Sequence, residues 1–309
     1  MKNKIETKGM GDIYLFTRYV NNLSNENIDE LTKEIVKTKN AWYIYLFARY
    51  VKNLSNENLD ILTEAIIETK DTEGIYLFAR HVKNLSNINI DALTKSIVET
   101  KKAEYIYDFA RDVKNLSNEN LDILTKEIVK TKNAWHIYLF ARYVKNLSNE
   151  NIDELTKGII ETNRIHYICD FFLGINGLGE KNRKDLIKTV YNFDNCEEYL
   201  LKIIRKQKEK LSEKEIYNIL SKIIKTKNKI YIAIALYYIN DISLISQIFG
   251  SLKSYIIFLD LNMEKVERLG FKISTFNLKE QSVDDLSYSY VDDNIDTYFE
   301  RETGQKVLS

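Results

Sequence analysis

The chain has 309 residues, no proline, 10 glycines and a balance of 45 basic against 45 acidic side chains. A net charge of zero gives no general electrostatic reason to bind nucleic acid or a membrane surface. Two cysteines are too few for a disulfide framework, and neither a run of about 18 apolar residues nor an opening signal segment is present. We therefore expect a soluble, cytoplasmic protein.

One phrase of the sequence recurs five times with few changes. Its arginine returns every 31 residues, at Arg18, Arg49, Arg80, Arg111 and Arg142. A fixed period of this length is typical of stacked repeat proteins, in which each repeat buries its apolar face only against its neighbours. The lack of proline and the scarcity of glycine favour helix throughout.

Each repeat is predicted to be a helical hairpin. In the second repeat the apolar residues of the first half share one helical face, and so do those of the second half. They are Ile44, Phe47, Ala48, Val51 and Leu54, followed by Leu59, Leu62, Ile66 and Ile67. Between the two helices Asn53 suits a left-handed turn position, and Ser55 is predicted to cap the second helix. Leu54 and Leu59 then form a hydrophobic staple across the cap.

The repeats lose their regularity towards the C-terminus. A sixth repeat has Leu173 in place of the arginine, and three glycines in its turn, Gly174, Gly177 and Gly179. A seventh keeps the cap at Ser212, an eighth helix pair is expected over residues 230–252, and closing helices over residues 254–269. The fold class predicted is all-α: a right-handed α-solenoid of about eight stacked helical hairpins.

Charge divides the chain into three predicted parts. Residues 1–163 hold the near-identical repeats and a short N-terminal cap, with 23 basic and 24 acidic side chains. Residues 164–274 are a degenerate, basic continuation, with 19 basic and 13 acidic side chains. Residues 275–309 carry 3 basic and 8 acidic side chains, and we expect them to form a flexible acidic tail.

The phrase from Tyr105 to Lys114 resembles a tandem repeat, of the pattern Y-I-Y-x-F-A-R-x-V-K, found in uncharacterised bacterial and phage proteins. More loosely, the array is similar to HEAT-like α-solenoids. The close resemblance covers about residues 10–163. It implies a solenoid fold and the binding of macromolecules, and it carries no catalytic residues over to this chain.

The five arginines have two interpretations. Each follows a tyrosine by four residues, and each repeat has an aspartate early in its second helix, at Asp29, Asp60, Asp91, Asp122 and Asp153. The favoured interpretation is a ladder of structural Arg–Asp pairs. The alternative is a phosphate-binding ladder, which needs arginines free of carboxylate partners.

The first helices differ mainly along one stripe. Positions 42, 46 and 50 of the second repeat are spaced i, i+4, i+8 and form a ridge away from the apolar face. Neutral drift explains variability at exposed sites, but it does not easily explain aromatic residues there, which often anchor protein interfaces. The predicted partner-binding residues are Trp42, Tyr43, Tyr50, His81, Tyr105, Trp135, His136 and Tyr143.

A second candidate surface is basic. Residues 181–229 hold 14 lysines and arginines against 7 acidic residues. The usual explanation is solvated helix ends and loops, and the alternative is a contact for an acidic partner, nucleic acid or the chain's own tail. The residues proposed for that contact are Lys181, Arg183, Lys184, Arg205, Lys206 and Lys208.

Signals for chemistry are weak. His166 and Cys169 stand three residues apart, but a zinc site needs three or four ligands. The three glycines of the sixth repeat do not follow a strand, as a dinucleotide-binding loop would. None of the three histidines pairs with a recurring serine or cysteine as nucleophile and base. We expect no enzyme activity, cofactor or metal.

We therefore predict a non-enzymatic binding protein, an adaptor or an inhibitor, that engages a protein partner through the solenoid surface. A phage-derived inhibitor of a host system is one form of it. The alternative is a nucleic-acid-binding solenoid that uses the basic C-terminal half. No membrane contact and no small-molecule substrate are expected.

Overall fold

The computed structural model describes residues 23–226, isolated positions between 231 and 239, and the pairs 272–273 and 288–289. The chain forms two compact units, residues 1–189 and residues 190–309. The predicted division after residues 163 and 274 stays a prediction. The expected eighth helix pair, the closing helices and the acidic tail lie almost wholly outside the described residues.

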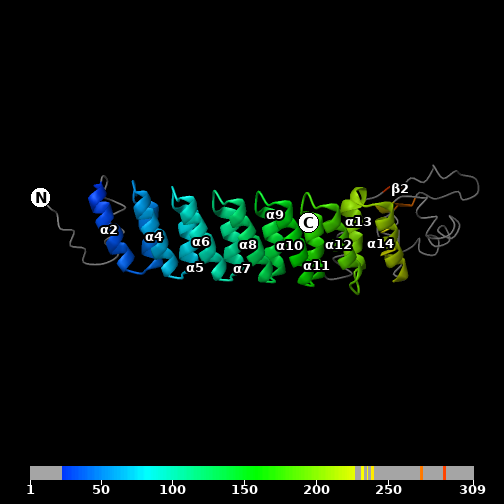
Figure 1. Cartoon of the computed structure of the whole chain (residues 1–309). Coiled ribbons are helices and arrows are strands. Elements are labelled where there is room, and N and C mark those ends of the chain that lie inside the picture. The colour runs from blue at the N-terminus through cyan, green and yellow to red at the C-terminus, as the bar shows by residue number, and fades with distance from the viewer. Residues whose placement is uncertain are drawn as a thin grey trace, which may run out of the picture. The chain divides into compact units, whose positions relative to one another are not determined.

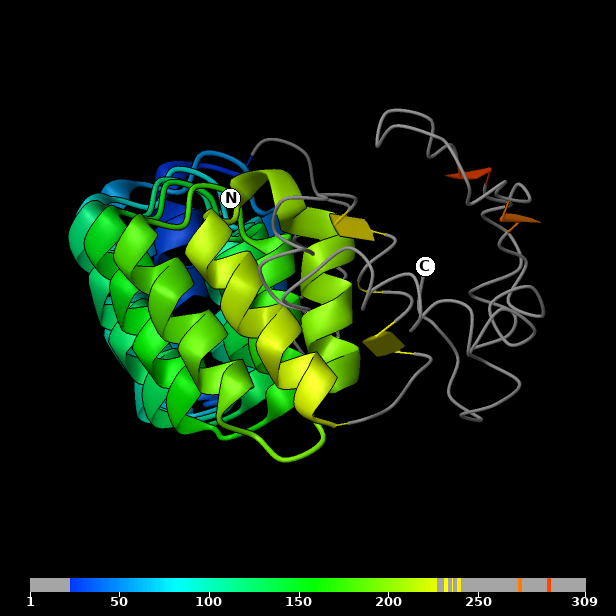
Figure 2. The same ribbon diagram turned by 90° about the vertical axis from the view of Figure 1, so that its right-hand side faces the viewer.

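The first unit is a stack of helical hairpins, which confirms the all-α solenoid. Its first helices are α3 (Ala41–Tyr50), α5 (Thr72–His81), α7 (Ala103–Asp112), α9 (Ala134–Tyr143) and α11 (Ile165–Gly174). Its second helices are α2 (Asn25–Lys37), α4 (Asn56–Glu68), α6 (Asn87–Glu99), α8 (Asn118–Lys130), α10 (Asn149–Glu161) and α12 (Glu180–Tyr191). Each helix packs against its counterpart in the next repeat, as α3 does on α5 and α8 on α10. The second helices therefore form one row (Figure 1), and successive repeats lie behind one another when viewed along the stack (Figure 2).

The turn from first to second helix has the predicted geometry. Asn53 has φ 62°, and the equivalent asparagines of the next three repeats have φ of 60–61°. Ser55 caps α4, because its side chain accepts a hydrogen bond from the N–H of Asn58 at 3.1 Å. In the sixth repeat Gly177 takes the asparagine's place with φ +77°, a backbone conformation that glycine adopts without steric cost.

The turn from second to first helix is one that the sequence did not reveal. Lys39 has φ 49°, and the equivalent residues of the next four repeats are also left-handed. Thr38 supports the turn, since its hydroxyl donates to the carbonyl of Ile35 at 2.7 Å and accepts from the N–H of Asn40 at 3.1 Å. The Asn40 side chain then caps α3 by accepting from the N–H of Tyr43.

A column of phenylalanines fills the centre of the stack. One phenylalanine from each first helix has no exposed surface, and the five are Phe47, Phe78, Phe109, Phe140 and Phe171. Their spacing of 31 residues places them at the same level of successive hairpins. Burial of such a ring stabilises a fold by about 2–3 kcal/mol, so this column supplies much of the cohesion between repeats.

The aspartate of each second helix pairs with the next repeat, which makes the predicted Arg–Asp ladder wrong. The side-chain amide of Asn58 donates to Oδ1 of Asp29 at 2.8 Å. The same bond recurs four more times at 2.6–2.9 Å, in Asn89–Asp60, Asn120–Asp91, Asn151–Asp122 and Asn182–Asp153. The asparagine is buried in every one of these bonds. A ladder of neutral-to-charged hydrogen bonds therefore joins the second helices and fixes their register.

We expect Asn120→Ala to lower the free energy of unfolding by about 1–2 kcal/mol, because Asp91 loses its donor. Thr125 is the matched control on the same helix, since its buried hydroxyl has no hydrogen-bond partner in the described part of the chain. Thr125→Val should leave stability unchanged or raise it. Urea denaturation measures the free energy of unfolding of both variants. An equal decrease in the two would show that the Asn–Asp hydrogen bonds do not stabilise the stack.

The second unit begins with one further hairpin, made of α13 (Glu197–Gln207), the 3₁₀ turn η1 (Lys208–Lys210) and α14 (Glu213–Lys225). Ser212 caps α14 in a reciprocal capping box with Glu215, as the sequence predicted. Further along, β1 (Lys272–Ile273) pairs antiparallel with β2 (Tyr288–Ser289), with Lys272 opposite Ser289. Within the described parts of both units, no helix is long and apolar enough to cross a membrane.

Candidate partner-binding surface

Two tryptophans stand out from the row of first helices. Trp42 on α3 is 53% exposed and Trp135 on α9 is 46% exposed. They occupy the same position in repeats two and five, and they are the only tryptophans of the chain. An indole this exposed stays largely in contact with water although its burial would be favourable, so both tryptophans are candidate anchors for a partner.

On α3 the tryptophan begins a column of stacked side chains. The rings of Trp42 and Tyr45 lie 5.5 Å apart between centroids. The guanidinium of Arg49 lies 5.7 Å from the Tyr45 ring and 5.3 Å from the Tyr50 ring, and it donates a hydrogen bond to the Tyr45 hydroxyl. We call these four residues the α3 cluster.

The same column recurs on α9. Trp135 and Tyr138 have ring centroids 6.0 Å apart. Arg142 lies 5.6 Å from the Tyr138 ring and 5.4 Å from the Tyr143 ring, and it donates to the Tyr138 hydroxyl. Tyr143 is itself 48% exposed. These four residues form the α9 cluster, in which the order of the side chains along the helix is that of the α3 cluster.

The remaining predicted partner-binding residues are half-buried between neighbouring first helices. His81 lies 6.2 Å from Tyr45 of the preceding repeat, measured between ring centroids. Tyr105 and His136 contact the preceding tyrosines in the same way, at 6.2 and 6.3 Å. Tyr43 and Tyr50 are half-buried as well. Their part in binding stays a prediction, and all of them except Tyr43 also contact a neighbouring side chain within the chain.

The predicted ridge needs one correction. Leu46 was placed on it with Trp42 and Tyr50, but only 7% of Leu46 is exposed. The exposed residues of α3 are therefore Trp42 near its start and Arg49 near its end, with the buried Tyr45 between them, rather than a continuous apolar stripe.

The repeats between the two clusters have a different surface. On α5, Glu73 replaces the tryptophan and Gly74 follows it. A Cβ at Gly74 would lie 2.7 Å from that of Ala41, so the close approach of α5 to α3 leaves no room for a side chain there. On α7, Glu104 takes the tryptophan's place and Asp108 and Asp112 follow at helical spacing. The row is thus acidic at α7, while the charges of α5 balance.

Asp112 joins the two middle repeats. Its carboxylate accepts a hydrogen bond from the Tyr76 hydroxyl at 2.7 Å and lies 3.1 Å from the guanidinium of Arg80. It also pairs with Arg111 at 2.7 Å, and Asp108 pairs with the same arginine at 2.8 Å. The arginines of α5 and α7 are therefore occupied by carboxylates, whereas those of the two clusters bind tyrosine.

These contacts shift several pKa values. The hydrogen bond from Arg111 lowers the pKa of Asp112 to about 2, although burial opposes the shift. Burial, followed by the bond to Asp112, raises the pKa of Tyr76 to about 12. Burial raises the pKa of Asp108 and lowers that of His136. The Asp112 carboxylate is therefore charged throughout the physiological range and binds its partners as an anion.

We expect Asp112→Asn to lower the free energy of unfolding at pH 7 by up to about 2 kcal/mol. A carboxyl group whose pKa falls from 3.8 to about 2 on folding stabilises the protein above pH 4 and loses that contribution as pH falls through 2. The difference between wild type and variant, measured by urea denaturation, should shrink over that range. Glu104→Gln, exposed on the same helix, should show a smaller difference. A difference for Asp112→Asn that does not change with pH would contradict this expectation.

Most of the predicted basic contact residues already have partners within the chain. Lys181, Arg183 and Lys184 lie on α12, where Arg183 stacks over the ring of Phe172 at 5.6 Å and Lys184 pairs with Glu180. In the second unit, Arg205 lies 5.9 Å from the Tyr238 ring, and the Lys208 ammonium donates to the Ile239 carbonyl. Lys206, like Lys181, is exposed. Their binding role stays a prediction, and several of them already stabilise the fold.

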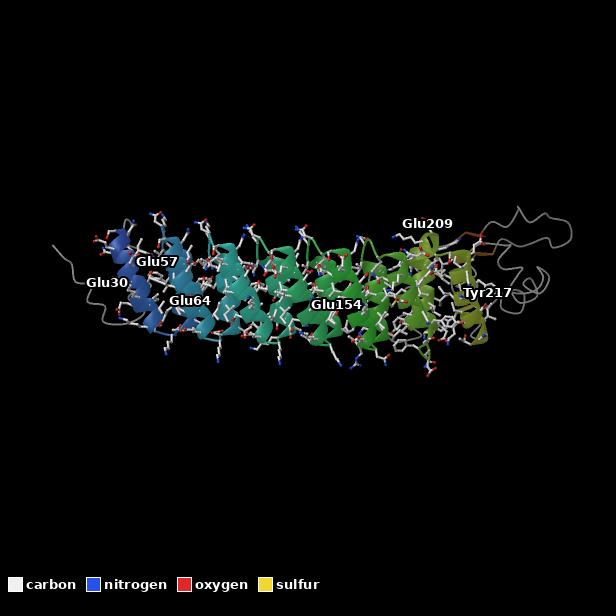
Figure 3. The ribbon with its side chains drawn as sticks, in the orientation of Figure 1. Glu30, Glu57, Glu64, Glu154, Glu209 and Tyr217 are labelled. Atoms are coloured by element: carbon white, nitrogen blue, oxygen red, sulfur yellow. The ribbon has the colours of Figure 1, made fainter. Side chains whose placement is uncertain are left out.

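The opposite row is strongly acidic. Helices α2, α4, α6, α8 and α10 together carry 17 acidic and 6 basic side chains. Figure 3 shows this face, with Glu30, Glu57, Glu64 and Glu154 on it. The first helices α3, α5, α7 and α9 carry four of each charge. The aromatic clusters and the acidic surface therefore belong to different rows of helices.

Groups suited to chemistry do not come together in the described residues. No cluster of three His, Cys, Asp or Glu side chains in that part of the chain could hold a metal ion. A surface hollow of about 450 Å³ near the C-terminal ends of α6 and α8 is lined by Val98, Glu99, Lys101, Glu127, Lys130 and Thr131. Its charged groups do not include a nucleophile with a neighbouring base, so it suggests no reaction.

Comparisons with known proteins leave the family open. No family model matches the chain, and no curated protein matches it. A solved structure described as "Computational Design of Self-Assembling Cyclic Protein Homooligomers" aligns with 84% of this chain and 92% of its own, at 15% identity and a TM-score of 0.12. At that score the similarity supports no conclusion about architecture, assembly or function.

Proposed function

We propose that the chain is a non-enzymatic binding protein, an adaptor or an inhibitor, that holds a protein partner against the row of first helices. The observation that carries the proposal is the pair of exposed tryptophans, each in contact with a tyrosine that an arginine of the same helix also contacts. Trp, Tyr and Arg are the residues that contribute most free energy at protein interfaces. Two such clusters on one row of helices favour a macromolecular partner over a small ligand.

The tryptophans are not needed for stacking the repeats. Repeats three and four carry Glu73 and Glu104 in their place, yet their first helices pack on their neighbours as α3 and α9 do. The space between neighbouring first helices is filled instead by the phenylalanine column, whose side chains have no exposed surface. About half of each indole is therefore available for a contact outside the chain, although Trp135 also contacts Tyr167 of the next repeat, with ring centroids 6.0 Å apart.

The low cysteine content favours a cytoplasmic setting, and the resemblance to repeats of bacterial and phage proteins favours an inhibitor of phage origin as one form of this function. A nucleic-acid-binding role has weaker support. Arg183, Arg205 and Lys208 have intramolecular contacts, and the second helices present a surplus of carboxylates that would repel a phosphate backbone.

Affinity capture from a lysate of the encoding organism, with and without nuclease, tests the proposal. The bait is the wild-type chain beside a Trp42→Ser/Trp135→Ser variant and a Tyr217→Ser control, which removes an exposed aromatic residue from α14. We expect a protein that is retained after nuclease treatment by the wild type and the control, and lost by the double variant. Capture that nuclease abolishes, or that the double variant retains, would overturn the proposal.

A further inference from the structure

The charges along the row of first helices follow a definite order. The α3 cluster contains Arg49 and is followed by Lys52, without any acidic residue on that helix. The α9 cluster contains Arg142 and is followed by Lys145, again without an acidic residue. Between them α7 carries three carboxylates and one arginine. The row is positive at α3, negative at α7 and positive at α9.

The two cluster arginines keep donors free for a partner. Arg49 and Arg142 donate to neutral tyrosine hydroxyls, and no ion pair within 4.0 Å is recorded for either among residues 23–226. A guanidinium has five N–H donors, so one bond to tyrosine leaves enough for a bidentate contact with a carboxylate. Asp170 adds a negative field at Arg142, so we expect the α9 site to be the weaker of the two.

We propose that the partner presents the complementary order, an acidic group, a basic group and a second acidic group, with an apolar side chain beside each acidic one. The acidic groups bind Arg49 and Arg142, the apolar side chains cover Trp42 and Trp135, and the basic group faces α7. This inference rests on the proposed function and specifies the chemistry of the protein that the surface selects.

The acidic middle favours a protein over a nucleic acid. A continuous phosphate backbone that reached both clusters would cross the carboxylates of α7, and like charges placed together cost several kcal/mol. A protein surface can change the sign of its charge between the two contacts. With neighbouring helices about 8–10 Å apart, the three steps from α3 to α9 span roughly 25–30 Å, the length of an extended segment of about nine residues.

The positive setting of each tryptophan is tested first, without any partner. Trp135→Phe leaves Trp42 as the only indole, and Trp42→Phe leaves Trp135. Relative to free tryptophan amide, iodide should quench each remaining indole more strongly than caesium does. Adding Arg49→Gln should lower iodide quenching of Trp42 at least twofold and leave that of Trp135 unchanged. Equal quenching by the two ions, or no effect of Arg49→Gln, would overturn the inference.

The charge order is tested with synthetic peptides and tryptophan fluorescence. One 16-residue peptide has an acidic block with leucine, a lysine block and a second acidic block with leucine. A second peptide of equal length and equal numbers of leucines and charged residues has lysine blocks at both ends and an acidic centre. We expect the first to bind at least tenfold more tightly, and Arg49→Gln to remove most of that preference.

A single-stranded oligothymidylate with as many phosphates as the peptide has residues is the third probe. Tighter binding of the second peptide, equal binding of both, or tightest binding of the oligothymidylate would each overturn the proposed charge order. None of these results touches the proposed function, because a captured protein that requires both tryptophans would still show the binding surface. If the partner were no longer captured while the peptide preference remained, the proposed function would fail and the charge order of the surface would stand.

Discussion

Trp42→Ala and Trp135→Ala are each expected to weaken binding of the captured partner at least tenfold, with unchanged helicity and melting temperature. A buried tryptophan at the centre of an interface contributes about 2 kcal/mol or more, which corresponds to roughly thirtyfold in affinity. The folded chain loses little, because about half of each indole is already exposed. Titration of the partner against each variant measures the first effect, and circular dichroism measures the second.

A matched control lies on the opposite row. Ile88 on α6 is 79% exposed, and the equivalent position is Glu57 in the preceding repeat and Glu119 in the next one. Ile88→Glu therefore removes an exposed apolar residue without disturbing the repeat, and it should leave affinity unchanged. If the tryptophan variants instead lowered the melting temperature and kept the affinity, both indoles would serve packing and the clusters would not be a binding surface.

Phe109→Ala should lower the free energy of unfolding by about 3–5 kcal/mol. The ring has no exposed surface and lies at the middle of the phenylalanine column, so its loss leaves a cavity between repeats three, four and five. Because the stability of a stack is a sum of repeat and interface contributions, a weakened centre should separate the melting of the two flanking parts. Trp42 in repeat two and Trp135 in repeat five lie on opposite sides of the cavity. In variants that keep only one of them, tryptophan fluorescence therefore reports the unfolding of one flanking part.

Phe109→Leu is the control, since it keeps most of the volume and should cost no more than about 1.5 kcal/mol. We expect one transition for this variant, with both tryptophans reporting the same midpoint. A single, unshifted transition for Phe109→Ala would show that the column does not couple the repeats.

Local signals made the hairpins predictable. The periodicity of Ile44, Phe47 and Val51 identifies a buried helical face, and Asn53 and Ser55 have side chains suited to the turn and the cap. These effects act within four residues, where the sequence states the spacing directly. Lys39 was missed because lysine has no special preference for positive φ, and the surrounding hydrogen bonds of Thr38 and Asn40 impose that conformation.

The ladder could not be read from the sequence for a different reason. In a perfect repeat every residue recurs at 31, so the arginine, the asparagine and the aspartate all have the period that a ladder requires. Which two of them meet depends on the rotation of one hairpin against the next. The structure selects Asn58 with Asp29, across 29 residues, and leaves Arg49 to Tyr45.

The same limit applies to the candidate surface. Variation along the first helices indicated Trp42 and Trp135, because aromatic residues away from an apolar face have no local explanation. It did not separate the exposed Tyr143 from the half-buried Tyr50 at the equivalent position, since their neighbours on the adjacent helices decide the exposure. Arg49 and Arg142 were predicted to pair with aspartates, because the sequence does not show how one hairpin is rotated against the next; in the structure both bind tyrosine.

Hydrogen–deuterium exchange of the chain with and without its captured partner tests the binding surface most directly. Amides of the first helices, read peptide by peptide, can be compared with those of the second helices of the same repeats. We expect slower exchange on binding in α3 and α9, a smaller change in α5 and α7, and none in α4, α6, α8 and α10. Protection confined to the second helices, or to α12 and the second unit, would contradict the assignment of the partner to the tryptophan clusters.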